Sequence, residues 1–156
     1  MKRILVFSDS HGECDNMIKV TENIIGVDLI VHCGDYSRDA VFMRKAFPDT
    51  DVVSVRGNNE FGLGFDELWE TIEVDGVRIF ITHGHIQGVK SGLDTFIERC
   101  KKENCSVGLF GHTHRSLCEK QDGVLLLNPG SIRGRMGTYG VIEIEDGEPK
   151  GAVISL

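Results

Sequence analysis

The feature that most constrains this chain is a set of five short apolar runs that each end in a polar cluster. "RILVF" leads into "SDSH", "DLIVHC" into "GD", "DVVSV" into "RGNNE", "VRIFI" into "THGH" and "SVGLF" into "GHTH". Apolar, β-branched runs of this length are typical of buried strands. Because sites in α/β sheets gather at the carboxyl ends of strands, we expect the five clusters to lie close together.

The whole pattern predicts a single α/β domain, residues 1–156, with no inserted cap. Strand-like runs alternate with helical periodicity in the first half, as in parallel βαβ units, whereas Asp-Gly turns join strands in the second half. A mixed sheet with helices outside, or two stacked sheets, fits this order. The expected strands are 3–7, 28–32, 51–55, 71–74, 77–81, 106–110, 124–127, 139–144 and 151–156, and the expected helices are 14–25, 39–47 and 91–102.

Composition narrows the function classes. With 40% hydrophobic and 26% charged residues in 156, the chain has the make-up of a soluble globular domain. Its apolar runs are too short to span a bilayer and its first residues do not resemble a signal peptide, so we expect a cytoplasmic protein without a membrane partner. The net charge of −7 argues against a stable nucleic-acid complex. Five cysteines without a C-x-x-C pair indicate reduced thiols rather than disulfides.

The polar clusters indicate a metal centre. Carboxylates, imidazoles and one amide without a thiolate suit manganese, nickel, iron or zinc better than magnesium or calcium, and we place manganese first. The candidate ligands outnumber those that one ion needs, so we expect two divalent ions bridged by a carboxylate. Such a pair makes hydroxide from water near neutral pH and can hold a phosphoryl group for in-line displacement. The same kind of site can also hydrolyse other esters or amides. His32 lies inside a strand, and we expect it to be a hydrogen-bonded core residue.

The ordered clusters resemble the five sequence blocks of the calcineurin-like metallophosphoesterases, and "NPGS" at 128–131 is similar to a turn of the small single-domain phosphodiesterases. This resemblance implies a four-layer αββα sandwich of two mixed sheets flanked by helices, with a dinuclear metal site at the strand C-terminal ends. It implies that Asp35 bridges the two metals. The resemblance assigns Asp9, His11 and His114 to the first metal, and Asn58, His83 and His112 to the second.

Two further residues are candidates for the catalytic step. Many relatives carry histidine where this chain has Asn59, which can donate a hydrogen bond but cannot act as a general acid. That difference disfavours substrates with poor leaving groups. His85 is the spare candidate for an acid or a phosphate contact, with ligand orientation as its alternative role. Arg133 and Arg135 are either solvated or reach a substrate phosphate.

The favoured hypothesis is a metal-dependent phosphodiesterase that hydrolyses a small or accessible phosphodiester through a dinuclear metal-activated hydroxide. A phosphomonoesterase of the same fold is the alternative within the enzyme class. A non-catalytic protein-binding scaffold, similar to the retromer subunit that shares this fold, is the alternative outside it. Retention of all seven ligand positions favours the enzyme. We expect a small phosphoester as the binding partner, and a homo-oligomer is compatible with the sequence.

Overall fold

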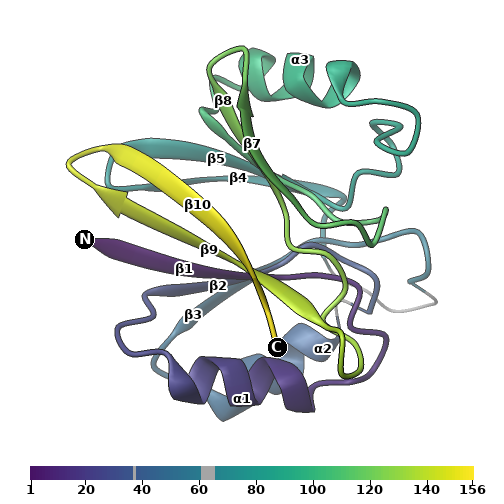
Figure 1. The fold of residues 1–156 in the computed structure, drawn as a ribbon, viewed down its shortest axis with the longest axis vertical. Helices are drawn as coiled ribbons and strands as arrows, with labels where there is room; N and C mark the ends of the chain where they lie inside the picture. Colours follow the sequence, from purple (N-terminus) through teal and green to yellow (C-terminus); the bar gives the residue numbers. More distant parts are fainter. Residues whose placement is uncertain (37, 61–65) are drawn as a thin grey trace.

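The chain folds into four layers, as the sequence led us to expect (Figure 1). The computed structural model describes residues 1–36, 38–60 and 66–156. Two five-stranded sheets stack face to face; helices α1 (Asp15–Asn23) and α2 (Asp39–Ala46) cover the outer face of one sheet, and α3 (Asp94–Lys102) covers the other. None of the helices in these ranges is long and apolar enough to cross a bilayer.

The first sheet contains the predicted βαβ units. Its strand order is β10-β9-β1-β2-β3, and β1, β2 and β3 are parallel. α1 connects β1 to β2 and α2 connects β2 to β3, and both helices end earlier than predicted. The strands are β1 (Lys2–Phe7), β2 (Leu29–His32), β3 (Asp51–Ser54), β9 (Thr138–Glu145) and β10 (Glu148–Ser155).

The second sheet, in the order β4-β5-β6-β8-β7, is also mixed. The run beginning at Leu117 was not predicted as a strand, because two adjacent residues in its middle, Glu119 and Lys120, are exposed. Asp75, Asp122 and Asp146 adopt positive φ and each precedes a positive-φ glycine, which confirms the Asp-Gly hairpin turns. The strands are β4 (Trp69–Val74), β5 (Val77–Thr82), β6 (Val107–Leu109), β7 (Leu117–Gln121) and β8 (Val124–Asn128).

Alternation along β1 shows how the layers are held together. Ile4 and Val6 pack between the two sheets, whereas Leu5 and Phe7 pack against the helical layer. All four side chains are fully buried, and burial of each contributes roughly 1.5–3 kcal/mol. A strand buried on both faces is rigid, so its carboxyl end holds the following residues in a fixed position.

The cysteines agree with the prediction of reduced thiols. All five are free, and Cys33, Cys100 and Cys105 are buried in the apolar clusters. Burial raises the pKa of the Cys100 thiol to about 12, so this group remains protonated near neutral pH and acts as a small apolar side chain.

Candidate metal centre

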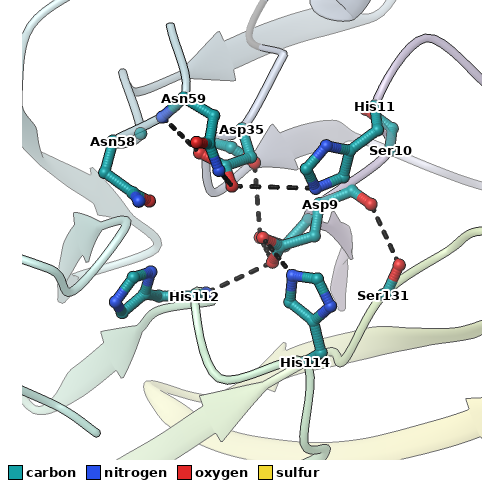
Figure 2. A network of polar contacts seen from close by, with 12 residues as sticks. Asp9, Ser10, His11, Asp35, Asn58, Asn59, His112, His114 and Ser131 are labelled. Carbon is teal, nitrogen blue, oxygen red and sulfur yellow. Dashed lines mark hydrogen bonds and ion pairs between the residues drawn. The ribbon is translucent and has the colours of Figure 1, made fainter.

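The seven predicted ligands meet at the carboxyl ends of strands from both sheets. Asp9 and His11 follow β1, and Asp35 follows β2. Figure 2 shows the side chains of these three residues close to one another, with those of Asn58, His112 and His114 around them. The two stacked sheets therefore bring together residues that lie far apart in sequence. His112 follows Asp9 by 103 residues, yet its backbone N–H donates to Asp9 Oδ2 at 3.2 Å.

The first group of side chains forms a compact nitrogen and oxygen cluster. One ligand atom from each of Asp9, His11, Asp35 and His114 lies within 4.8 Å of the others. The His114 Nε2 atom is 3.1 Å from Asp9 Oδ1, and His11 Nε2 is 3.7 Å from Asp35 Oδ2. Asp9 Oδ1 and His11 Nε2 are buried and have no hydrogen-bond partner in the described part of the chain. Buried polar atoms without partners are costly, and a cation between them would remove that cost.

The second group surrounds the Nε2 atom of His83. This nitrogen lies 3.0 Å from Asn58 Oδ1, 3.2 Å from His112 Nδ1 and 3.4 Å from Asp35 Oδ1. Asp35 thus faces both groups, whereas His112 and His114 each face a different one. His112 and His114 occupy alternate positions of "HTH", and their imidazoles face the two neighbouring groups.

The proton on His83 has a defined position. Its Nδ1 atom lies 2.8 Å from the carbonyl oxygen of Cys33, which can only accept, so Nδ1 carries the hydrogen. Burial, the main cause, lowers the pKa of His83 to about 4, and Nε2 is therefore unprotonated near neutral pH. A bare Nε2 then faces the carbonyl oxygen of Asn58, and two acceptors at this separation cannot hydrogen-bond to each other. This pair of atoms fits a cation.

Backbone strain is concentrated in the same residues. Non-glycine residues rarely adopt positive φ, and each instance costs of order 1 kcal/mol or more. The surrounding sheets must hold these residues in place, as is common at functional sites. Positive φ angles of 49° to 69° occur at five of the predicted ligands, namely Asp9, His11, Asp35, His112 and His114.

Two glycines allow the clusters to approach closely. A Cβ atom on Gly57 would collide with Asp35 Oδ1 and would lie 2.5 Å from the Asp35 backbone nitrogen. A Cβ atom on Gly111 would collide with Ser8 Oγ and lie 2.8 Å from Asp9 Oδ2. The "GN" and "GH" glycines are thus required by sterics rather than by their φ angles.

A buried hydrogen-bond chain supports the loop after β1. The Gly34 amide donates to His32 Nδ1 at 3.1 Å, so His32 Nε2 carries the proton and donates to Ser10 Oγ at 2.8 Å. Ser10 in turn donates to Asp39 Oδ2 at 2.7 Å, which also accepts from the Gly12 amide. His32 is thus the hydrogen-bonded core residue that the sequence predicted. Ser10 and Asp39 were missed as support residues, because their partners lie far away in sequence.

The "NPGS" segment holds two of the loops together. The Asn128 amide donates to Gly111 O and Thr113 Oγ1, both at 3.0 Å. Ser131 Oγ donates to Asp9 O at 2.9 Å (Figure 2). These bonds connect the carboxyl end of β6 to that of β1, and therefore fix His112 and His114 relative to Asp9.

The two candidate catalytic residues differ in their surroundings. Asn59 donates its backbone N–H to Asp35 Oδ1 at 3.1 Å and its side-chain amide to Asp35 Oδ2 at 2.8 Å (Figure 2). His85 lies with its ring centroid 5.5 Å from that of His83, and its buried Nδ1 has no hydrogen-bond partner among described residues. Arg133 is paired with Glu13 at 3.4 Å, and exposed Arg135 lines a separate hollow beside α1.

Electrostatics distinguish the two carboxylates. Burial raises the pKa of Asp9, and the hydrogen bond from Ser8 only partly offsets this. Burial also acts on Asp35, but His83 and the two hydrogen bonds from Asn59 outweigh it and lower the pKa of Asp35. Burial and the neighbouring His83 lower the pKa of His112 to about 4, and burial lowers the pKa of His85. Near neutral pH the second group therefore offers neutral imidazoles and a carboxylate, which is the state that binds metals.

Comparison with known proteins gives consistent results. A probable metallophosphoesterase of Bacillus subtilis, YsnB, is 33% identical over 92% of this chain and 85% of its own length. A phosphodiesterase of Methanocaldococcus jannaschii, MJ0936, is 31% identical over 95% of both chains. The crystal structure of a predicted phosphoesterase from Streptococcus pneumoniae superposes with a TM-score of 0.80 at 28% identity, covering 99% of this chain and 89% of that one.

A more distant match concerns the fold alone. Vacuolar Protein Sorting 29 from Cryptosporidium parvum has a TM-score of 0.78 at 16% identity, covering 99% of this chain and 97% of that chain. The model of the calcineurin-like phosphoesterase superfamily domain matches residues 1–147, which include all seven predicted ligands. This chain is therefore a member of the calcineurin-like phosphoesterase superfamily.

Proposed function

We propose that this protein is a phosphodiesterase that works with two divalent metal ions, manganese first among them. The observation that carries the proposal is the 3.0 Å approach of His83 Nε2 to Asn58 Oδ1 beside the four-residue cluster around Asp9. Two neighbouring groups of nitrogen and oxygen atoms, with Asp35 facing both, support a pair of cations, which would offset the cost of the buried unpaired atoms. The phosphoesterase names of the relatives support a hydrolase.

Each metal would be held by side chains of this structure. Asp9, His11 and His114 would hold the first ion and Asn58, His83 and His112 the second, with Asp35 shared. When bound, the ions would supply Lewis-acid activation of water and neutralise charge on the phosphoryl oxygens. The protein's own contribution is orientation: Cys33 O fixes the tautomer of His83, and Asn59 holds both oxygens of Asp35.

The preference for a diester rests on the surroundings of the leaving group. Asn59 is engaged with Asp35 and has no proton to give, so a good leaving group is favoured. His85 lies beside His83, its buried Nδ1 has no hydrogen-bond partner among the described residues, and we assign this residue a hydrogen bond to a substrate oxygen. The archaeal relative is itself named a phosphodiesterase.

The Asp35→Asn variant tests this assignment. Hydrolysis of bis-(p-nitrophenyl) phosphate with Mn²⁺ should fall by at least about 100-fold, because loss of even an outer partner of a metal ligand costs 10–100-fold. Asp51→Asn removes the same charge from an exposed position at the start of β3 and should retain the wild-type rate. An Asp35→Asn variant as active as the wild type would refute the shared role of this carboxylate.

A further inference from the structure

A pocket lies beside the loop that carries His112 and His114. It has a volume of about 550 Å³, which is within the range of small-molecule sites. The loop that carries the two histidines forms one wall, because Thr113 lies between His112 and His114 and Arg115 follows directly. The segment between β5 and α3 forms the opposite wall, through Val89, Lys90 and Leu93.

The inner surface of the pocket is apolar and firmly packed. Val89 and Phe110 are buried members of the cluster beneath α3, and Leu93 and Leu117 pack against that cluster while half-buried. Phe110 packs against Phe96 of α3 in a tilted arrangement with ring centroids 4.8 Å apart, which holds the floor of the pocket against the helix. Such a surface suits a flat or compact apolar group that would otherwise be hydrated.

The rim of the pocket carries two unpaired cations. The side chains of Lys90 and Arg115 are exposed and form no ion pair or hydrogen bond within the described residues. By contrast, Arg133 pairs with Glu13, and Arg99 pairs with Glu103. In a chain of net charge −7, a local positive rim next to a metal centre favours an anionic ligand.

We propose that this pocket binds the alcohol part of the diester substrate, and that this part carries an apolar ring together with a second anionic group. The inference rests on the proposed function, since the metal centre would take the scissile phosphate and leave Lys90 and Arg115 for a second anion. An uncharged alcohol would leave both cations without a partner. A bare anion would leave the apolar wall hydrated, so the pocket is complementary only to a ligand with both properties.

Binding to metal-free protein tests the pocket separately from hydrolysis. Isothermal titration calorimetry in the presence of a chelator would compare adenosine 5′-monophosphate, which joins a ring to a dianion, with adenosine and with inorganic phosphate. We expect the monophosphate to bind at least about tenfold more tightly than either fragment, because each fragment lacks one set of contacts. If inorganic phosphate binds as tightly as the nucleotide, the apolar wall has no role and the proposal is wrong.

Three variants test whether the nucleotide binds in this pocket and whether it needs the two cations. The double variant Lys90→Ala/Arg115→Ala should lose the preference for the monophosphate over adenosine, whereas Lys45→Ala/Lys150→Ala removes the same charge from exposed positions on α2 and β10 and should keep it. Ser116→Trp places bulk in the pocket at an exposed position and should weaken nucleotide binding by about tenfold while both cations remain. Equal losses in both double variants, or undiminished binding by Ser116→Trp, would overturn the proposal. Nucleotide binding without diester hydrolysis in the metal-loaded enzyme would instead locate the failure in the proposed function.

Discussion

Asn59 shows how one residue can affect the whole metal centre. Its backbone and side chain both donate to Asp35, a carboxylate that faces both groups of candidate ligands. These two bonds contribute to the lowered pKa of Asp35 and hold its oxygens in fixed directions. Asn59 therefore has a positioning role in this structure, whereas the sequence alone suggested a place near the leaving group.

The Asn59→Ala variant should separate these roles. Loss of the amide leaves Asp35 Oδ2 without its hydrogen bond, so affinity for Mn²⁺ should fall by about 10-fold, within the range for partners of metal ligands. Asn59→Asp places like charge beside Asp35 and should weaken the metal further. Calorimetric titration with Mn²⁺ measures both effects, and an unchanged affinity in Asn59→Ala would contradict the positioning role.

The loop after β1 depends on elements from the opposite side of the sheet. His32 is buried on β2 and connects the Gly34 amide to Ser10, which leads to Asp39 at the start of α2. Burial is the main cause that lowers the pKa of His32 to about 4, below the value of 6.5 expected in the unfolded chain. The unfolded state thus binds a proton in the interval between these values and the folded state does not.

Stability should therefore fall as the pH is lowered from about 6.5 to about 4, and the His32 contribution should be constant above and below that window. The shift is worth up to about 3 kcal/mol. His32→Gln removes the titrating group, so the metal-free variant should lose less stability across this window than the metal-free wild type. Urea unfolding at several pH values measures the difference. Identical pH dependence in the two proteins would show that His32 is not the group responsible.

Most of the fold and the site follow from local patterns. Apolar runs identified nine strands because each is at least half-buried on one face, and the polar residues at their ends converge because parallel strands share an edge. β7 was not predicted as a strand, because Glu119 and Lys120 are exposed at the edge of the sheet. The support roles of Ser10, Asp39 and Asn128 could not be predicted, because their partners lie far away in sequence and depend on how the two sheets stack.

At the scale of the whole molecule, the two sheets form one apolar interior and together carry the candidate metal centre. Ile4 and Val6 from the first sheet pack in one cluster with Ile79 and Leu109 from the second. The candidate ligands also come from both sheets, so a bound metal would connect the two sheets. We therefore expect a single cooperative unfolding transition of the kind shown by single domains, and expect metal to stabilise the whole fold rather than one loop.

Differential scanning calorimetry with Mn²⁺ and with a chelator tests this expectation. Ligand at about 100 times its dissociation constant stabilises a native state by about 2.7 kcal/mol, which corresponds to an increase in Tm of roughly 5–10 °C for a protein of this size. The Asp35→Asn variant should show a smaller shift. Two separate unfolding transitions, or a Tm that does not change when Mn²⁺ is added, would contradict a metal centre shared by both sheets.

The most direct test of the account is paired hydrolysis after metal exchange. The protein would be stripped of metal and reconstituted separately with manganese, nickel, zinc or magnesium, and each form assayed on bis-(p-nitrophenyl) phosphate and p-nitrophenyl phosphate. We predict that manganese or nickel restores turnover and that the diester is cleaved faster than the monoester. Faster cleavage of the monoester would point to a phosphomonoesterase, and metal binding without cleavage of either ester would contradict the enzymatic account and favour a binding scaffold.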